Sequence, residues 1–488
     1  MLRVLGRFLN QITMYRLMLY FLLGLWVGAV VLAFTEVLPY NFLDILLAGV
    51  YLVGVCNLAN YLLAKVFKAR TNLESASITA LILTLIVGPL AVWENIIVLT
   101  FIGVFAMAAK YILAIRKKHI FNPAASAVLL SVIFLNIGAS WWIGSKFTLP
   151  LIILGGVLVL AKTKRYELVG SFLVVYFFTL ILSGGRVSID SFTVPAIWFF
   201  VLVMLVEPLT SPATKNRQII FGAVVAAVYF LLQKIIPGYN YGLETSLVVG
   251  NLLNLALSPA FNMVLVFKKK EEVVQNIWQF YFEPMSKFEF TPGQYLEWTY
   301  PHKNPDSRGV RRYFTISSAP EEGHVTVTMR VAEKGSSFKS ALMNMNGGEE
   351  LTTSGPQGDF VLPEDKSIPI AFIAGGIGVT PFRSMVKSML SQDEKRDIML
   401  LYANSAEGDI AFRDLFEKAK DVGVKTFYID TKKEGHIDEP MIEEKVPDYK
   451  KRVFFVSGPE PMVEAIKKML SGINVGKIKT DFFPGYTE

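Results

Sequence analysis

Cysteine and histidine are scarce in this sequence of 488 residues, and their scarcity excludes several redox centres. The single cysteine, Cys56, cannot form a disulfide within the chain or hold an iron–sulfur cluster, which needs about four thiolates. Of the four histidines only His119 lies in the first 270 residues, so a haem bound by paired histidines in that half of one chain is excluded. We expect no metal site, a buried Cys56 in an apolar helix, and His119 at a solvated loop end.

Acidic residues are scarce in the first half of the chain. Residues 1–270 hold 21 Lys and Arg against 8 Asp and Glu, whereas the remainder holds 27 against 33. The basic side chains stand between long apolar runs and form no continuous patch, so no nucleic-acid partner is expected despite a pI of 9.1. A hydrophobic content of 52% indicates a lipid bilayer as the partner instead.

Apolar runs long enough to cross a bilayer recur through the first half. The loops on one side of the expected spans, together with the two chain ends next to the first and last spans, hold 18 Lys and Arg residues, and the loops on the other side hold 3. Because cytoplasmic loops carry an excess of Lys and Arg, we expect the side with 18, and both termini, to be cytoplasmic. The basic N-terminus lacks a small-residue cleavage site, so we expect a retained first helix. We expect about ten spans, at 16–34, 42–67, 76–90, 93–113, 124–139, 148–161, 167–185, 193–207, 217–236 and 245–267.

The pattern of side chains changes after Lys270. Residues 273–298 alternate apolar and polar side chains and are rich in β-branched and aromatic types, which predicts strands joined by a turn at Pro292-Gly293. Residues 368–385, with the sequence IPIAFIAGGIGVTPFRSM, predict an apolar strand, a glycine-rich turn and a helix that opens at Pro381. A soluble module with both strand-rich and α/β parts is therefore expected.

The residue types in this module suit a flavin dinucleotide. A pyrophosphate needs a cation and hydrogen-bond donors, and Arg312 offers a planar guanidinium fork. An isoalloxazine ring needs an apolar face and a small hydrogen-bonding neighbour at N5, for which Phe314 and Thr315 are the candidates. An uncrowded turn with hydroxyl groups is offered by Gly335, Ser336 and Ser337.

A second phosphate site is expected at the glycine-rich turn. Gly375, Gly376 and Gly378 would let the backbone approach a phosphate, and the N-terminus of the following helix favours an anion. Alone this pattern is weak, because ordinary α/β turns also need glycine.

Taken in order, these motifs closely resemble the ferredoxin-NADP reductase superfamily over residues 271–488. The resemblance implies an antiparallel β-barrel that binds FAD at 271–362 and an α/β domain that binds the nicotinamide at 363–488, after a transmembrane domain at 1–270. The family's Arg-x-aromatic-Ser/Thr motif falls on 312–315, its glycine motif on 375–381 and its Cys-Gly-Pro motif on 457–459. The implied cofactor-binding residues are Arg312, Tyr313, Phe314, Thr315, Met329, Arg330, Val331, Gly335, Ser336, Ser337, Gly375, Gly376, Gly378, Thr380, Pro381, Gly458, Pro459 and Met462.

The resemblance also implies which residues surround the reacting rings. Thr315, Ser457 and Phe483 are the implied catalytic residues, and Asp481 and Phe483 form the family's terminal acidic-x-aromatic element. Ser457 stands where the family often has cysteine, which puts the hydride-transfer rate in question. Phe483 either covers the flavin or is a core aromatic at a strand end.

The choice between the two nicotinamide cofactors rests on the segment after the second strand of the α/β domain. A 2′-phosphate needs a cation there, but Asn404, Ser405, Glu407 and Asp409 come first. Because the two anions disfavour a further phosphate, the sequence favours NADH, with NADPH as the alternative.

Residues 65–262 carry a second resemblance, to a membrane family that includes the B-type membrane component of the sodium-pumping NADH:quinone oxidoreductase and the D-type membrane component of the Rnf complex. The matching segments are SASITALILTL at 75–85, HIFNPAA at 119–125 and EPLTSPATKNRQIIFG at 207–222. This resemblance implies ten helices in two inverted five-helix repeats, with flavin in the membrane. The Ser-Gly-Ala-Thr string that carries covalent FMN in that family is absent, so we expect a non-covalent FMN, riboflavin or quinone.

Candidate residues for this membrane cofactor lie near the ends of spans: Ser77, Thr79, Asn122, Pro123, Glu207, Thr210 and Ser211. Prolines at membrane depth free backbone groups that a ligand can satisfy. The competing interpretation is that Asn122-Pro123 simply starts a helix in water, and that acids such as Glu74, Glu94 and Glu207 are interfacial rather than part of an ion path.

The combined expectation is a prokaryotic, multi-pass, inner-membrane NAD(P)H oxidoreductase. It would pass electrons from NADH through FAD to a flavin or quinone among the helices, and then to a quinone or an extracytoplasmic redox protein. Two rivals remain open: an enzyme that uses its helices only as an anchor, and a sodium or proton transporter that is driven by, or senses, its flavin module. Partner subunits or a homodimer are also left open.

Overall fold

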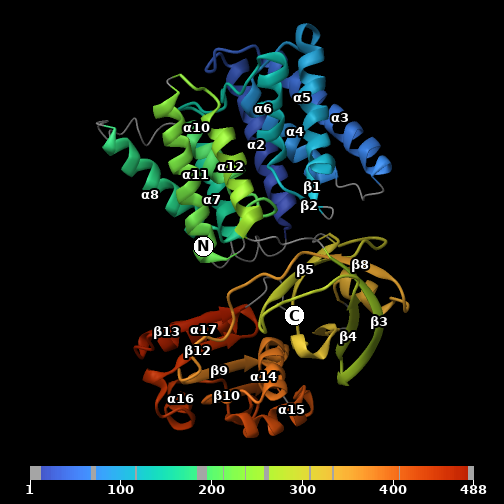
Figure 1. Ribbon diagram of the computed structural model, residues 1–488, viewed down its shortest axis with the longest axis vertical. Coiled ribbons are helices and arrows are strands. Elements are labelled where there is room, and N and C mark those ends of the chain that lie inside the picture. Colours follow the sequence, from blue (N-terminus) through green and yellow to red (C-terminus); the bar gives the residue numbers. More distant parts are fainter. Residues whose placement is uncertain are drawn as a thin grey trace. The chain divides into compact units, whose positions relative to one another are not determined.

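The computed structural model describes residues 12–67, 73–115, 118–183, 195–212, 214–236, 238–257, 263–306, 309–331, 335–405 and 407–481. The chain divides into two units, Met1–Phe261 and Asn262–Glu488, which we call the helical unit and the sheet unit (Figure 1).

The helical unit is built from apolar helices that begin at local caps. Thr13, Asn41 and Asn122 each stand before a helix and accept a backbone N–H of its first turn. Its described helices are α2 (Met14–Phe34), α3 (Phe42–Val66), α4 (Leu73–Val87), α5 (Val92–Ile112), α6 (Pro123–Leu135), α7 (Leu149–Thr163), α8 (Tyr166–Leu182), α10 (Pro195–Phe199) with its π-helical continuation η1 (Phe200–Met204), α11 (Lys215–Ile235) and α12 (Gly242–Leu257); β1 (Ala114–Ile115) and β2 (Lys118–His119) form a short hairpin.

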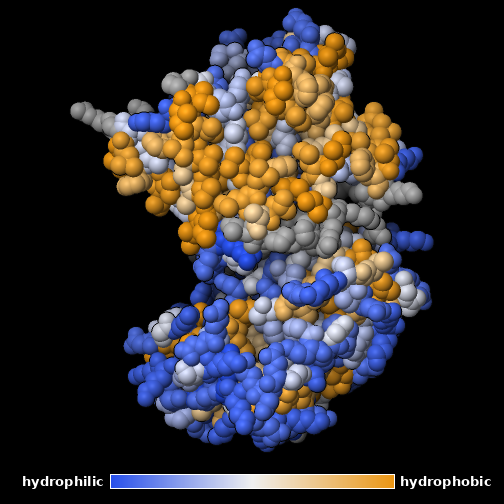
Figure 2. Space-filling model, viewed as in Figure 1, coloured by the Kyte–Doolittle hydropathy of each residue, from blue (hydrophilic) through white to orange (hydrophobic). Residues whose placement is uncertain are grey.

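Four helices, α2, α3, α5 and α11, are long and apolar enough to span a membrane. The other described helices are shorter, so the expected number of ten spans stays a prediction. The surface of the unit is broadly hydrophobic (Figure 2), and Trp93, Ile97 and Ile133 are 82%, 76% and 73% exposed. Apolar side chains at such exposure are typical of a surface that meets lipid or a partner.

The last expected span, 245–267, is wrong at its C-terminal end. Helix α12 ends at Leu257, and strand β3 (Met263–Val274) already contains Met263–Phe267. These five residues, MVLVF, are apolar enough to extend a helix, but their burial alternates along the strand. Lys268–Lys270, expected at the membrane end of the helices, therefore also lie in β3.

The first part of the sheet unit is a six-stranded antiparallel sheet in the order β6-β5-β8-β3-β4-β7. The Pro292-Gly293 turn connects β4 to β5 as expected, and a side chain at Gly293 would collide with the Phe360 carbonyl oxygen. Beyond β6, the Ser317 N–H donates to the Thr326 oxygen of β7, which brings the two edge strands together. The strands are β3, β4 (Ile277–Pro284), β5 (Tyr295–Thr299), β6 (Arg311–Thr315), β7 (Val325–Arg330) and β8 (Glu350–Thr353), with the short helices η2 (Pro320–Glu322) and α13 (Ser337–Met343).

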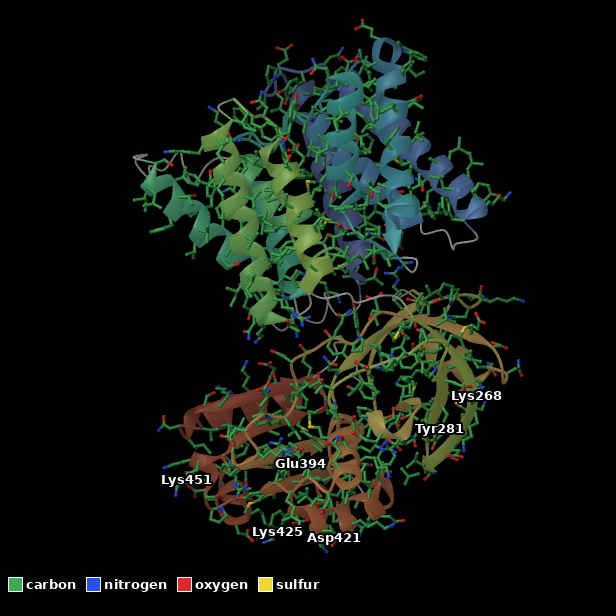
Figure 3. All side chains as sticks on the ribbon, in the orientation of Figure 1. Lys268, Tyr281, Glu394, Asp421, Lys425 and Lys451 are labelled. Atoms are coloured by element: carbon green, nitrogen blue, oxygen red, sulfur yellow. The ribbon has the colours of Figure 1, made fainter. Side chains whose placement is uncertain are left out.

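The second part of the sheet unit is a parallel sheet in the order β11-β10-β9-β12-β13. Alternate side chains of its strands face two helical layers (Figure 1): Phe372 packs in the core with α14, and Ala371 in the core with α17. Charged side chains such as Asp421, Lys425 and Lys451 are exposed and point outward (Figure 3). Its elements are β9 (Ile370–Gly375), η3 (Gly376–Val379), α14 (Thr380–Gln392), β10 (Ile398–Asn404), η4 (Glu407–Asp409), α15 (Arg413–Lys418), η5 (Ala419–Val422), β11 (Val424–Asp430), α16 (Glu439–Lys445), η6 (Tyr449–Lys451), β12 (Val453–Ser457), α17 (Glu460–Gly472) and β13 (Lys477–Asp481).

Candidate functional site

Arg312 lies at the centre of an anion-binding turn. One guanidinium nitrogen, Nη2, donates to both carboxylate oxygens of Asp306 at 2.7 and 2.8 Å and to the Ser336 hydroxyl at 3.1 Å. The Ser337 N–H also donates to Asp306 Oδ2, at 3.2 Å. Arg312, Ser336 and Ser337, which the sequence grouped as pyrophosphate ligands, thus converge on one carboxylate. Because a carboxylate and a phosphate accept the same donors, this cradle fits a pyrophosphate oxygen.

Hydrogen bonds of the Ser337 hydroxyl to Asp306 and His302 stabilise the turn that contains Ser336 and Ser337. The Ser337 hydroxyl accepts the Asp306 N–H at 2.9 Å and lies 2.9 Å from His302 Nε2. The side chain of Arg312 is 11% exposed and lies over the Phe338 ring, 5.5 Å from its centroid. Gly335 directly precedes Ser336 in this turn. Sequence reasoning missed Asp306 and His302, because neither lies in a recognisable motif.

The two aromatic residues between Arg312 and Thr315 point to different surroundings. Phe314 is 4% exposed and packs in the core of the antiparallel sheet against Trp298 and Phe338. Tyr313 is 42% exposed, donates to Glu297 at 2.7 Å and meets Tyr295 edge to face. Stacking of Phe314 on an isoalloxazine ring stays a prediction, and the Tyr295–Tyr313 pair is an aromatic surface that sequence reasoning missed.

Three residues from distant parts of the chain meet at one edge of the parallel sheet. The Thr315 hydroxyl donates to Asp481 Oδ2 at 3.4 Å, although 166 positions separate them. Ser457 ends β12 directly opposite Asp481 on β13, and Ser457 is 3% exposed. The expected catalytic residues Thr315 and Ser457 are therefore brought together with Asp481. Phe483, the third, lies outside the described residues.

The two nicotinamide motifs pack tightly on each other. A Cβ at Gly378 would lie 2.5 Å from Gly458 Cα and from the Ser457 carbonyl oxygen, and a Cβ at Gly375 would lie 2.2 Å from Met462 Sδ. These two glycines let the chain segments approach each other, whereas the sequence predicted that they face a phosphate. Gly376 differs, because its φ of +51° favours glycine and a Cβ there would meet nothing within 4 Å. Of the three, Gly376 offers open backbone to a ligand.

Helix α14 begins at this turn and holds the two parts of the sheet unit together. Thr380 and Pro381 open the helix, with Pro381 in its first turn as expected. Arg383 donates to both carboxylate oxygens of Glu322 and, at 2.8 Å, to the Ser317 carbonyl oxygen. The Ser384 hydroxyl donates to the Ser318 carbonyl oxygen at 2.6 Å. The glycine-rich turn is thereby fixed to the segment that follows Thr315.

The Arg383–Glu322 pair predicts an acid-sensitive clamp. Burial alone would raise the pKa of Glu322, but the hydrogen bonds and charge of Arg383 outweigh it and hold the pKa below its usual value. A carboxyl with a lowered folded-state pKa adds stability above its unfolded pKa of about 4.3, and this stability is lost as the pH falls through the folded pKa. Glu322→Gln should therefore destabilise the sheet unit by about 3 kcal/mol at neutral pH and flatten its acid dependence.

Unfolding of the full chain in denaturant, followed at neutral and acid pH, measures this effect. Glu321→Gln is the matched control, because Glu321 is an exposed neighbour that accepts hydrogen bonds from the Ser388 hydroxyl and the Gln392 amide, which are uncharged. Equal unfolding midpoints for Glu322→Gln and Glu321→Gln at neutral pH would contradict the clamp.

Of the expected flavin residues at the end of β7, Arg330 contacts the α/β part, whereas Met329 and Val331 make their contacts within the antiparallel sheet. Met329 is fully buried, and the Val331 N–H donates to the Asn276 carbonyl oxygen at 2.8 Å. Arg330 forms an ion pair with Asp409 at 3.6 Å. Asp409 also accepts from the Ser405 hydroxyl at 3.0 Å. The guanidinium group of Arg330 is therefore already paired with an acidic side chain.

In the helical unit, several expected membrane-cofactor residues form one polar cluster, which we call the Glu207 cluster. Glu207 Oε2 accepts from Asn122 Nδ2 at 3.0 Å and from the Thr210 hydroxyl at 2.9 Å, and the Ser211 hydroxyl donates to the Glu207 carbonyl oxygen. Asn122 also caps α6 through the Ala125 N–H, with Pro123 in the first turn. Asn122 therefore starts a helix, as one interpretation expected, but it is 3% exposed and does not lie in water. Binding of a membrane cofactor at Asn122 stays a prediction.

His119 contradicts the expectation of a solvated loop end. It is 9% exposed, and its Nε2 lies 3.5 Å from Glu207 Oε1. Three further residues of this cluster were missed: Asn251 and Asn254 donate to the Thr210 carbonyl oxygen at 3.1 and 3.0 Å, and the buried Arg165 donates to the Pro212 and Pro208 carbonyl oxygens. Asparagines spaced by three in the apolar run GNLLNLAL were the available signal.

Ser77 and Thr79 make their hydrogen bonds elsewhere. The Ser77 hydroxyl accepts from Asn57 Nδ2 at 3.0 Å, and the Thr79 hydroxyl donates back to the Ser75 carbonyl oxygen within α4. Cys56 is buried as expected, and no group of three or more metal-binding side chains occurs in the described part of the chain.

Comparison with known proteins identifies two domains in the sheet unit. Residues 264–362 match the oxidoreductase FAD-binding domain, and residues 372–468 match the oxidoreductase NAD-binding domain. The sheet unit is therefore an FAD-binding and NAD-binding oxidoreductase module, with a sheet-based FAD domain and an α/β NAD domain. The resemblance of residues 65–262 to the membrane components of the sodium-pumping and Rnf complexes stays a prediction.

Individual relatives agree with the domain matches. A flavohemoprotein of Halalkalibacterium halodurans is 25% identical over 235 residues, which are 43% of this chain and 56% of that protein. NADH-cytochrome b5 reductase 1 of Aspergillus terreus is 28% identical over 242 residues, 46% of this chain and 81% of that protein. A crystal structure of an Amycolatopsis cytochrome P450 reductase aligns with 45% of this chain and 69% of its own, at 20% identity and a TM-score of 0.40. The chain spans a little over half the length of the flavohemoproteins that it matches.

Proposed function

We propose that this chain, which carries FAD-binding and NAD-binding oxidoreductase domains, is a membrane-bound NAD(P)H oxidoreductase that sends electrons into its own helical unit. The acceptor beyond FAD would be a non-covalent flavin or quinone among the helices, and then a quinone or an extracytoplasmic redox protein. The observation that carries the reductase part is the contact of Thr315 with Asp481 beside Ser457. It joins the expected flavin motif to the expected nicotinamide motif.

The residues of the sheet unit have separable roles in this proposal. Bound FAD would accept a hydride from NADH and release electrons singly. Arg312, Ser336 and Ser337 would hold the pyrophosphate, since all three donate to the Asp306 carboxylate, Ser336 through its hydroxyl at 3.4 Å. Gly376 would present open backbone to the nicotinamide cofactor. Thr315 and Ser457 would place hydroxyl groups at the edge where the two rings meet.

The helical unit supports a second carrier. The hydrocarbon core of a bilayer is about 30 Å thick, so a flavin on one side cannot reach an acceptor on the other without an intermediate. The Glu207 cluster supplies carboxylate, amide and hydroxyl groups of the kind that orient a polar ring. The exposed apolar side chains of the unit support its insertion into lipid.

Flavin stoichiometry and sidedness test this proposal. Purified full-length protein should contain FAD and one further flavin or quinone per chain, all extractable without breaking a covalent bond. In sealed vesicles that expose the sheet unit inside, NADH enclosed with the protein should reduce an impermeant acceptor outside. One flavin per chain without quinone would contradict the second carrier, and reduction only on the NADH side would favour a helical anchor.

We expect NADH to be preferred over NADPH by at least about tenfold in kcat/KM, because a 2′-phosphate would meet Asp409. Asp409→Asn removes this repulsion and releases Arg330, which is paired with Asp409 at 3.6 Å. Asp409→Asn should therefore lower the ratio of kcat/KM for NADH to kcat/KM for NADPH. Asp414→Asn, an exposed acid on α15 nearby in sequence, is the control. Steady-state NADH and NADPH oxidation measures both variants; an equal preference in Asp409→Asn and Asp414→Asn would contradict the role of Asp409.

A further inference from the structure

A carboxyl group is completely buried at the start of α12. Glu244 is 0% exposed and stands in the first turn of this helix. Its Oε1 accepts from the indole N–H of Trp141 at 3.0 Å, whereas its Oε2 is buried without a hydrogen-bond partner among the described residues. Burial of an unpaired carboxylate destabilises a folded protein. A leucine at position 244 would not carry this cost in the free energy of unfolding.

Trp141, whose indole N–H donates to Glu244, has a strained backbone conformation. Its φ of +53° lies in the left-handed region, which a bulky side chain rarely adopts. The backbone is fixed there because the N–H groups of Ser140 and Trp141 both donate to the Ile86 carbonyl oxygen, at 2.8 and 2.9 Å. The indole ring meets Phe199 and Phe200 edge to face. Strain that the surrounding packing maintains in this way points to a functional contact.

Helix α12 carries polar side chains at two levels. Asn251 and Asn254, seven and ten residues after Glu244, fall on the same side of the helix and join the Glu207 cluster. Seven residues of helix rise about 10 Å. Glu244, near the N-terminal end of α12, and the Glu207 cluster, near its C-terminal end, therefore lie on one side of the helix, with the apolar Leu247 and Val248 between them.

The ligand chemistry at Glu244 favours a proton over a metal cation. Hard cations need several oxygen ligands, whereas the side-chain hydrogen bond that Glu244 makes is with an N–H donor, the Trp141 indole. No ion pair among the described residues involves Glu244, and α6, which packs on α12, carries no titratable side chain. From α11, which also packs on α12, the interacting titratable group is Tyr229, whereas the Tyr239 hydroxyl in the turn before α12 is hydrogen-bonded to Thr245.

We propose that Glu244 is a reversible proton-binding site of the helical unit. This inference does not depend on the proposed electron path, because binding and release of a proton at Glu244 need no electron transfer.

Infrared spectroscopy of the purified full-length protein tests the site. The C=O stretching band of a protonated buried carboxyl group should be present, should lose intensity reversibly as the pH is raised, and should be absent from Glu244→Gln. Glu94→Gln is the matched control, because Glu94 also lies in the first turn of a helix of this unit but is exposed. It should leave the band unchanged. Glu244→Gln keeps an oxygen that can accept from Trp141, so its thermal stability should equal or exceed that of the wild type.

Trp141→Phe provides a second test that does not remove the carboxyl group. Loss of the N–H donor at Oε1 should move the same C=O band to higher frequency. A band that persists in Glu244→Gln, that stays constant at every pH at which the protein is folded, or that does not move in Trp141→Phe would overturn the proposal. An absent second membrane cofactor would refute the electron path and leave this result untouched.

Discussion

Arg312→Ala is expected to purify with little or no FAD. Arg312 Nη2 makes two short hydrogen bonds to a carboxylate and a third to Ser336, and the same guanidinium group would face a pyrophosphate. A hydrogen bond to a charged group contributes about 1.5–3 kcal/mol, so loss of two should weaken FAD binding by about 3 kcal/mol or more. That corresponds to a dissociation constant raised more than about 100-fold.

Flavin absorbance per chain, and FAD titration of the flavin-depleted protein, measure this loss. Arg311→Ala is the matched control, because Arg311 is the adjacent residue on β6 but pairs with Glu297 at 3.1 Å. Arg312→Lys should give an intermediate affinity, since it keeps the charge without the planar fork. If Arg312→Ala holds FAD as tightly as Arg311→Ala does, Arg312 is not the pyrophosphate ligand.

Gly378→Ala should abolish most NADH oxidation while FAD stays bound. The added Cβ would lie 2.5 Å from backbone atoms of Ser457 and Gly458, and backbone cannot rotate away as a flexible side chain can. Overpacking of this kind costs about 1–3 kcal/mol and moves the two nicotinamide motifs apart. Because the reacting rings must be aligned closely, we expect kcat/KM for NADH to fall by a factor of about 100.

Stopped-flow reduction of the bound flavin by NADH separates this effect from a loss of FAD. Gly472→Ala is the control: Gly472 lies at the end of α17, and a Cβ there would meet nothing within 4 Å. Normal flavin reduction in Gly378→Ala would show that the close packing of residues 375–378 on residues 457–462 is not needed for hydride transfer.

Local patterns in the sequence predicted individual elements of the sheet unit, whereas its division into a β-barrel and an α/β domain was implied by a family resemblance. Residues 368–385 combine an apolar strand, glycine and proline in an order that only a strand–turn–helix satisfies, and the structure has β9, η3 and α14 there. The pattern failed at Met263–Phe267, where five apolar residues suit a helix and a buried strand equally well. The periodicity of apolar side chains cannot distinguish a helix from a buried strand over only five residues.

The candidate site was predictable only where a motif marks it. Arg312, Ser336 and Ser337 were grouped from residue chemistry, and they do converge. Asp306 lies only six residues before Arg312 but in no motif, and Glu244 acquires its importance from a contact with Trp141, 103 positions away. A motif marked Asp481, but its contact with Thr315, across 166 positions, was not predicted. His119 looked solvated because three cations precede it, yet it is buried beside Glu207. The burial of His119 depends on contacts with residues distant in the sequence, such as Glu207, so the residues next to it in the chain do not predict it.

The meeting of Thr315 with Asp481 has a consequence for biosynthesis. A ribosome delivers β6 long before β13, so the flavin half of the reactive edge is complete while the nicotinamide half is still being translated. A nascent chain could collect its prosthetic group early without consuming reduced pyridine nucleotide. Electron flow would begin only when β13 docks beside β12 and brings Asp481 to Thr315.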